Sequence, residues 1–236
     1  VKSEKFNKPT PAEIAYWGGY FFYHNRLHRN YQDDISLHYY LLASKDGITI
    51  GKRYFKHENN KEDYPFSPSG HNLYDNNSKL YYCRDFDNIV YQIHEDSVVP
   101  RFRINLPNPL PASMIEERPN EMSLLRSGYS LGITDIYEYG GLLFFRFVKD
   151  GYIWSCLYNV EESKQVYCAK RIKFLDSSLI DTIDGIYKDC FYSILTPEYL
   201  DYAFSENPLE DYPDLFKTYD VEGDNPVIAF YRAVVR

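Results

Sequence analysis

The sequence lacks the long apolar segments and the surplus of basic residues that are typical of membrane-spanning and nucleic-acid-binding proteins. No apolar run approaches the roughly 20 residues that a helix needs to cross a bilayer. The 236 residues include 26 Lys and Arg and 34 Asp and Glu, a formal net charge of −8. Such an acidic chain is a poor electrostatic partner for nucleic acid or an anionic membrane. We therefore predict no nucleic-acid partner and no transmembrane segment, and we expect an unidentified small molecule, glycan or protein instead.

Catalytic and metal-binding motifs are also missing. There is no GxSxG nucleophile elbow, and the four cysteines, Cys83, Cys156, Cys168 and Cys190, form no CxxC pair. No histidine lies near them at metal-ligand spacing, so we predict no metal site and no cofactor. Cys156 and Cys168 are expected on adjacent strands and could face each other, but a one-residue shift of register would put them on opposite faces. The favoured interpretation is four buried free thiols that act as small hydrophobes.

The N-terminal stretch VKSEKFNKPTPAE lacks the apolar core of a signal peptide, and the chain does not start with Met. A processed or trimmed product is the expectation from this stretch.

Aromatic residues are abundant, with 25 Tyr and 15 Phe against 2 Met and 2 Trp. Aromatic side chains suit a pleated, half-buried surface, so this composition favours strands. The segment from Ile133 to Phe174 contains apolar runs closed by turn signals at Gly140-Gly141, Lys149-Asp150-Gly151 and 161–164. Such runs predict an antiparallel meander, which needs neighbouring sheets to bury its faces.

The phrase of this meander recurs along the chain. LYDNNSKLYYCRDFDNIVYQI starts at Leu73, IYEYGGLLFFRFVKDGYIWSCLY at Ile136 and IYKDCFYSIL at Ile186. Meanders spaced roughly 40 to 60 residues apart are typical of a β-propeller, and a β-sandwich of hairpins is the second interpretation. We predict an all-β fold, with residues 1–236 as one propeller-like domain. The blades are expected at roughly 14–56, 71–106, 131–175 and 180–236, with a 107–127 insertion where Ser113 and Glu116 suggest a capping box and a short helix.

Three stretches carry a resemblance to a known family: LYYCRDFDNIVYQIHEDSVVPRFRINL, ITDIYEYGGLLFFRFVKDGYIWSCLYNVEESKQV and DNPVIAFYRAVVR. The first contains a strand of the type D-x-I-Y-x-I, at Asp87, Ile89, Tyr91 and Ile93, with Val90 inserted before the Tyr. A strand with Pro100 and Phe102 follows it. The last stretch is a final strand that begins with Asp-Asn-Pro-Val at 224–227. From roughly Gly19 onward the chain resembles the six-bladed β-propeller proteins of Bacteroides-type bacteria.

The resemblance implies a secreted or lipid-anchored protein, in the periplasm or anchored to the outer membrane. About four blades are countable, near Ala15, Leu73, Ile133 and Ile186. Set against the family, this count implies part of a six-bladed propeller or a smaller ring, and a homodimer if blades are missing.

Two arginines interrupt dense apolar strands at the same place in the repeated phrase: Arg84 in LYYCRD and Arg146 in LLFFRF. A charged residue within a blade strand faces solvent, a partner or the central channel. Two interpretations stay open. Each Arg ends its strand at the surface, or it lines the axial pocket in which propellers commonly bind ligands.

The candidate ligand-binding residues are Arg84, Arg146, Asp85, Asp87, His71 and Trp154. The first function hypothesis is a non-enzymatic ligand-binding or protein-interaction module of the bacterial cell envelope. The alternative is a carbohydrate-active hydrolase or lyase that uses paired carboxylates at one end of the channel. No catalytic residue is identified by the sequence.

Overall fold

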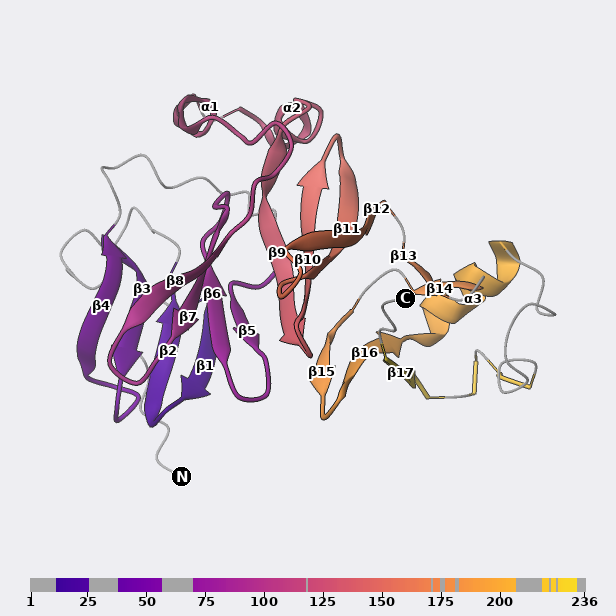
Figure 1. Cartoon of the computed structure of the whole chain (residues 1–236), viewed down its shortest axis with the longest axis horizontal. Coiled ribbons are helices and arrows are strands. Elements are labelled where there is room, and N and C mark those ends of the chain that lie inside the picture. The colour runs from indigo at the N-terminus through magenta and orange to yellow at the C-terminus, as the bar shows by residue number, and fades with distance from the viewer. Residues whose placement is uncertain are drawn as a thin grey trace. The chain divides into compact units, whose positions relative to one another are not determined.

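The computed structural model of the chain describes residues 12–25, 38–56, 70–117, 119–170, 172–174, 177–180, 183–206, 218–220, 222–223 and 225–232. These residues form antiparallel sheets with few helices (Figure 1), which confirms the predicted all-β class. The chain divides into two compact units, Val1–Thr134 with Val148–Gly151, and Asp135–Phe147 with Tyr152–Arg236. We call them unit 1 and unit 2.

The first sheet of unit 1 is a meander of β1 (Glu13–Trp17), β2 (Tyr20–His24), β3 (Tyr39–Ser44) and β4 (Ile50–Lys56). Its hairpins use the turn chemistry that the sequence shows: Gly18 and Gly19 both have positive φ between β1 and β2, and so does Gly47 before β4. One face of this sheet contributes the buried side chains of Phe22, Leu41 and Ala43 to a hydrophobic cluster.

The second sheet of unit 1 packs against this face. Its strands are β5 (Leu73–Asp75), β6 (Leu80–Cys83), β7 (Ile89–Ile93) and β8 (Val98–Arg103), in sequence order. Leu80, Tyr82 and Ile93 complete the cluster that the first sheet begins. The two meanders therefore bury apolar faces against each other, as sheets packed in layers do.

Two short helices follow β8: α1 (Ala112–Glu116) and α2 (Glu121–Leu125). Ser113 lies inside α1, so the capping box expected at Ser113 does not begin this helix. The observed cap belongs to α2, where the Asn120 side chain accepts a hydrogen bond of 2.9 Å from the Ser123 amide. Leu124 of α2 is buried in a small cluster with Leu131 and Val148.

The third sheet is the meander of β9 (Ser130–Tyr139), β10 (Leu142–Lys149), β11 (Tyr152–Asn159) and β12 (Lys164–Ala169). The last strand does not reach the end of the Ile133–Phe174 segment that the sequence predicts as a meander. It ends at Ala169, and Ile172–Phe174 is a separate strand, β13, which pairs with β14 (Ser177–Ile180). Lys170 and Arg171 separate the two strands in the sequence.

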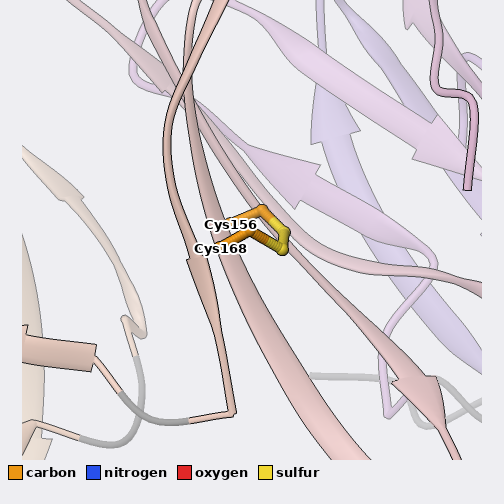
Figure 2. Close-up of a disulfide and its surroundings, with 2 residues drawn as sticks. All are labelled: Cys156 and Cys168. Carbon is orange, nitrogen blue, oxygen red and sulfur yellow. A yellow bond between two sulfur atoms is a disulfide. The ribbon is translucent and has the colours of Figure 1, made fainter. Parts of the chain in front are cut away.

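Cys156 and Cys168 form a disulfide across β11 and β12 (Figure 2), so the expectation of four free thiols is wrong. Close to the turn, Asn159 pairs with Lys164 and Tyr158 with Gln165, a register that would set Cys156 opposite Tyr167. The register shifts between Leu157 and Tyr158, and beyond the shift Cys156 lies directly opposite Cys168. A β-bulge inserts one residue into one strand of a pair, and this one aligns the two sulfurs.

The fourth sheet lies in unit 2 and has three strands, β15 (Gly185–Tyr187), β16 (Cys190–Leu195) and β17 (Val227–Tyr231). Helix α3 (Pro197–Glu206) follows β16. Phe191 and Leu195 pack in one buried cluster with Leu200 of α3 and with Phe144 of β10. One face of this sheet is therefore a core face.

Candidate functional site

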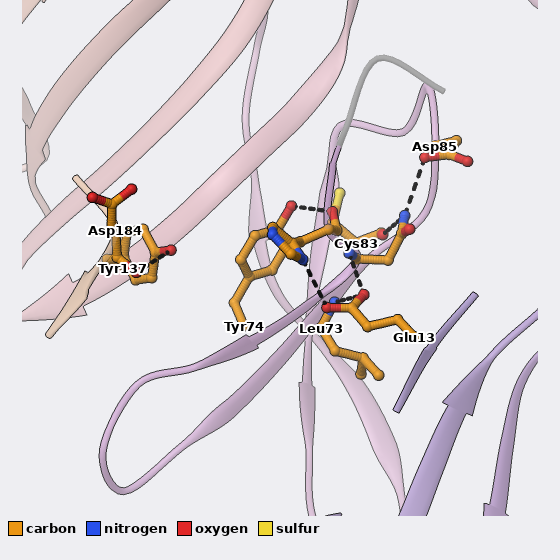
Figure 3. A network of polar contacts seen from close by, with 9 residues as sticks. Glu13, Leu73, Tyr74, Cys83, Asp85, Tyr137 and Asp184 are labelled. Carbon is orange, nitrogen blue, oxygen red and sulfur yellow. Dashed lines mark hydrogen bonds and ion pairs between the residues drawn. The ribbon is translucent and has the colours of Figure 1, made fainter. Parts of the chain in front are cut away.

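A carboxylate joins the two sheets of unit 1 where β5 begins (Figure 3). Glu13 of β1 accepts hydrogen bonds from the backbone amides of Asn72, at 2.7 Å, and Leu73, at 2.9 Å. The Nδ1 atom of His71 lies 3.3 Å from the other Glu13 oxygen, and the His71 side chain is 68% exposed. His71, a predicted ligand-binding residue, thus stands at the surface beside a contact that holds one sheet to the next.

Asp85 belongs to the same network. The buried Asn72 side chain donates to the Cys83 carbonyl at 2.9 Å and to Asp85 Oδ1 at 3.1 Å. Tyr74 donates its hydroxyl to the carbonyl of His71. Burial, reinforced by the charges of Asp87 and Asp85, raises the pKa of the Cys83 thiol well above its usual value. Cys83 is therefore a protonated core thiol and not a nucleophile.

Arg84 and Asp87 form an ion pair in the turn after β6. Arg84 donates to Asp87 Oδ2 from Nε at 2.9 Å and from Nη2 at 2.6 Å. Its guanidinium carbon lies 5.3 Å from the Phe55 ring centre and 5.9 Å from that of Tyr40. Burial lowers the pKa of Arg84, but the charge and hydrogen bonds of Asp87 outweigh it, so the pKa is raised overall. This guanidinium is committed to packing between the sheets of unit 1.

Asp87 also shapes its turn. Its Oδ1 accepts from the amides of Asn88, at 2.7 Å, and Ile89, at 3.1 Å, so both carboxylate oxygens are engaged. Strand β9 lies against this turn, because the Ile133 amide donates a hydrogen bond of 3.2 Å to the Asp87 carbonyl. Next to Ile133, Gly132 has a φ of +103°, and a Cβ there would lie 2.8 Å from the Phe86 Cα. Only glycine allows this backbone approach.

Arg146 occurs in unit 2 at the corresponding place, the fifth residue of β10, and it is also paired. Its Nε and Nη2 atoms each lie 2.7 Å from Oδ2 of Asp135 on the neighbouring strand β9. Asp135 is buried and has a φ of +54°. Nearby, Tyr137 donates its hydroxyl to the Asp184 carbonyl at 3.0 Å, and burial is the main cause that raises its pKa.

Trp154 of β11 is half-buried and stacks on Phe147 with ring centres 6.2 Å apart. The Lys170 ammonium lies 5.8 Å from the Trp154 ring centre and 3.5 Å from that of Tyr152. The indole Nε1 is buried and finds no hydrogen-bond partner among the described residues. Trp154 is therefore a packing residue beneath an aromatic and cationic surface formed by Tyr152 and Lys170.

A recess of about 270 Å³ lies in unit 2 between the β9–β10 hairpin and the end of the fourth sheet. Its wall contains the Asp189–Arg232 ion pair, at 2.5 Å, whose side chains are largely exposed. The lining residues are Tyr139, Gly140, Leu142, Asp189, Phe191, Tyr231 and Arg232. In the part of the chain that the structure describes, no three His, Cys, Asp or Glu side chains gather as a potential metal site.

The second face of the β15–β17 sheet is apolar and open to solvent. We call it face A and define it by Tyr187, Tyr192, Ile194, Ile228 and Phe230. Ile194 pairs with Ile228 and Tyr192 with Phe230 across the strands. The Phe230 ring lies 5.8 Å from that of Tyr187 and 6.4 Å from that of Tyr192. Gly185 leaves room for the Tyr192 ring, because a Cβ at Gly185 would lie 2.6 Å from it.

Four of the five residues that define face A are exposed. Tyr187, Ile194, Ile228 and Phe230 are between 48% and 55% exposed. The candidate residues were selected mainly for their charge, so the sequence analysis did not include the residues of face A. The sequence VIAFY of β17 nevertheless contains a pattern that could have indicated this face. Both of its alternating sets of side chains are apolar, which is typical of strands covered on two faces.

Successive four-stranded antiparallel meanders are the blades expected of a protein of the β-propeller class. It belongs to the family described as a 6-bladed β-propeller, whose model matches residues 14–178. This finding confirms the predicted fold class and the resemblance. The description of the family names a fold and no activity.

A crystal structure of a Bacteroides fragilis protein, inferred to be exported, is similar to this chain with a TM-score of 0.70 and 15% identity. The similarity covers 93% of this chain and 64% of that protein. At this identity the likeness concerns the fold. No curated protein matches the chain. No helix among the described residues is long and apolar enough to cross a membrane.

Proposed function

We propose that the chain is a non-enzymatic protein-interaction module of the bacterial cell envelope. Face A carries this proposal. Its exposed apolar side chains lie next to one another and face each other in pairs across two strands. A contiguous surface of this kind is typical of a protein interface, and without a partner it promotes aggregation. Tyrosine and phenylalanine are also enriched at the centres of interfaces.

The charged candidate residues support a binding role over catalysis. Arg84 and Arg146 each donate hydrogen bonds from two nitrogens to one carboxylate. Asp87 also accepts hydrogen bonds from two backbone amides. A catalytic acid or base must be reachable by substrate and exchange protons with it. Side chains held in this way position turns and strands.

Two observations support the envelope as the compartment. The Cys156–Cys168 disulfide suits an oxidising environment such as the bacterial periplasm. The structurally similar Bacteroides fragilis protein is inferred to be exported.

The test replaces Ile228 by a photo-crosslinking amino acid, in a chain that is directed to the cell envelope of a Bacteroides host. Tyr202 is the matched control, because it is also about half exposed but lies on α3. We expect protein adducts from position 228 that are absent from position 202 and are lost when Phe230→Lys is added. Equal adducts at both positions, or none at position 228, would overturn the proposal. Turnover of a polysaccharide that Asp85→Asn abolishes would overturn the non-enzymatic assignment.

A further inference from the structure

We propose that the recess in unit 2 is a binding site for one ring of a neutral sugar, with the Asp189–Arg232 pair at its rim. This site goes beyond the proposed function and does not depend on face A. Phe191 and Tyr231 line the recess and pair with each other across β16 and β17. Because side chains alternate along a strand, they lie on the opposite face of the sheet from Phe230.

The floor of the recess is apolar and fixed by the core beneath it. Leu142 is 7% and Phe191 2% exposed. The Phe191 ring lies 6.5 Å from that of Phe144 in the hydrophobic cluster of unit 2. Tyr231 packs against the same cluster, and its hydroxyl is hydrogen-bonded with the buried Ser193 side chain. Tyr231 therefore offers a ligand its ring.

Two hairpin turns and the end of β17 form the rim. Tyr139 ends β9 and is 37% exposed. Nothing lies within 4 Å of a Cβ added at Gly140, so this turn leaves the recess open. On the other side, Arg232 donates from Nη2 to Asp189 Oδ2 at 2.5 Å. The Cys190 thiol lies 3.6 Å from the second Asp189 oxygen, so the carboxylate is held from both sides.

The Asp189–Arg232 pair disfavours a charged ligand. Its two charges compensate each other, so an anion or a cation would have to displace a partner that is already in place. The two side chains are 50% and 71% exposed, so both can still form hydrogen bonds. A guanidinium only donates and a carboxylate only accepts, whereas a hydroxyl group does both. A donor beside an acceptor therefore suits adjacent hydroxyl groups on a neutral molecule.

The size and the walls of the recess favour a single sugar ring. Pockets for drug-sized molecules measure roughly 300 to 1,000 Å³. The recess, at about 270 Å³, is slightly smaller. Aromatic rings have an electronegative face, which attracts the C–H groups of a sugar ring. A hexose can therefore lay its C–H face on the aromatic walls and direct its hydroxyl groups to the pair.

The test is saturation-transfer difference NMR of the purified chain with the methyl glycosides of glucose, galactose and mannose, at about 1 to 20 mM. We expect saturation of at least one glycoside, strongest at its ring C–H protons. Arg232→Met and Tyr139→Ala should each weaken its binding by about tenfold or more. Tyr202→Ala, at a position 53% exposed on α3, is the control and should bind as the wild type does. Circular dichroism confirms that each variant is folded.

Two results would overturn the sugar site: no saturation of any of the three glycosides, or equal signals from the wild type and Arg232→Met. Inorganic phosphate or L-phenylalanine tests the ligand class. If either binds the wild type and displaces the glycoside, the neutral class is wrong. Phe230→Lys lies on the other face and should bind the glycoside normally. Failure of the crosslinking experiment at face A therefore leaves this site standing, and the reverse also holds.

Discussion

Arg146 and Asp135 meet through two nitrogens and one oxygen: Nε and Nη2 of the arginine each lie 2.7 Å from Oδ2 of the aspartate. Both side chains are about 15% exposed or less, so neither is well solvated. Removing one partner of such a pair is therefore more destabilising than replacing both by apolar side chains.

Replacing Arg146 by Met should therefore lower the free energy of unfolding by about 2 kcal/mol, because the poorly solvated Asp135 carboxylate loses its ion pair with Arg146. Urea denaturation measures the change. Adding Asp135→Asn should recover part of the loss. Arg232→Met, which removes an exposed pair with Asp189, is the control and should leave the stability unchanged. A stable Arg146→Met protein would show that the pair is not structural.

Glu13→Gln should lower the free energy of unfolding by about 1 to 2 kcal/mol, because a neutral amide is a weaker acceptor for the Asn72 and Leu73 amides. Hydrogen exchange at the Leu73 amide should become faster in the same variant. His71→Ala removes only the exposed partner and should cost about 0.5 kcal/mol or less. Equal effects of the two changes would contradict this assignment.

Thiol titration of the denatured, unreduced chain should find two of the four cysteines reactive, Cys83 and Cys190. Replacing Cys156 and Cys168 by Ser should lower the free energy of unfolding by about 3 kcal/mol, since the bridge closes a loop with a sequence separation of 12. Four reactive thiols before reduction would exclude the disulfide.

Stability should fall at alkaline pH. Burial and then the charge of Asp184 raise the pKa of Tyr231 to about 12, although a hydrogen bond with Ser193 works against them. In the unfolded chain the pKa is about 10, so above that pH the unfolded state loses the proton first. The contribution of Tyr231 is complete below pH about 10 and is lost as the pH rises towards about 12.

Urea unfolding of the wild type and of Tyr231→Phe, measured between pH about 8 and about 11.5, isolates this contribution. The variant should lose less stability over the alkaline part of the range. Parallel pH profiles for the two proteins would refute the raised pKa.

Gly132→Ala should destabilise the fold by about 2 to 4 kcal/mol, because the new methyl group meets the Phe86 backbone and φ is positive. Gly19→Ala is the control: its φ of +80° is also positive, but nothing lies within 4 Å of the added Cβ. It should cost about 1 kcal/mol. Thermal or urea unfolding compares the two, and a similar cost for both would mean that the close approach is unimportant.

Local chemistry explains why most of the strands could be predicted. Gly140-Gly141 and Asp150-Gly151 impose positive φ between apolar runs, and those runs become β9, β10 and β11. The break between Ala169 and Ile172 falls at Lys170-Arg171, which contains no glycine, proline or asparagine, and the next strand depends on its pairing with β14. Strand ends were predictable where a turn marked them.

The candidate site was predictable only in part. Arg84 and Arg146 were singled out because a charge in an apolar strand needs an explanation, and each is an ion-paired side chain. Their partners lie three residues ahead in one case and on the neighbouring strand in the other, a difference that spacing in the sequence cannot reveal. Face A was missed because exposure of an apolar strand depends on what packs beside it.

The amino-acid sequence by itself determined the class of the fold, since aromatic runs and glycine turns act within a few residues of one another. Tertiary structure decided the rest. The bulge in the β11–β12 pair sets Cys156 opposite Cys168, and packing decides which face of β15–β17 is core and which is open. Both outcomes depend on pairing between segments distant in the chain, and a one-residue change of register reverses which side of a sheet each side chain occupies.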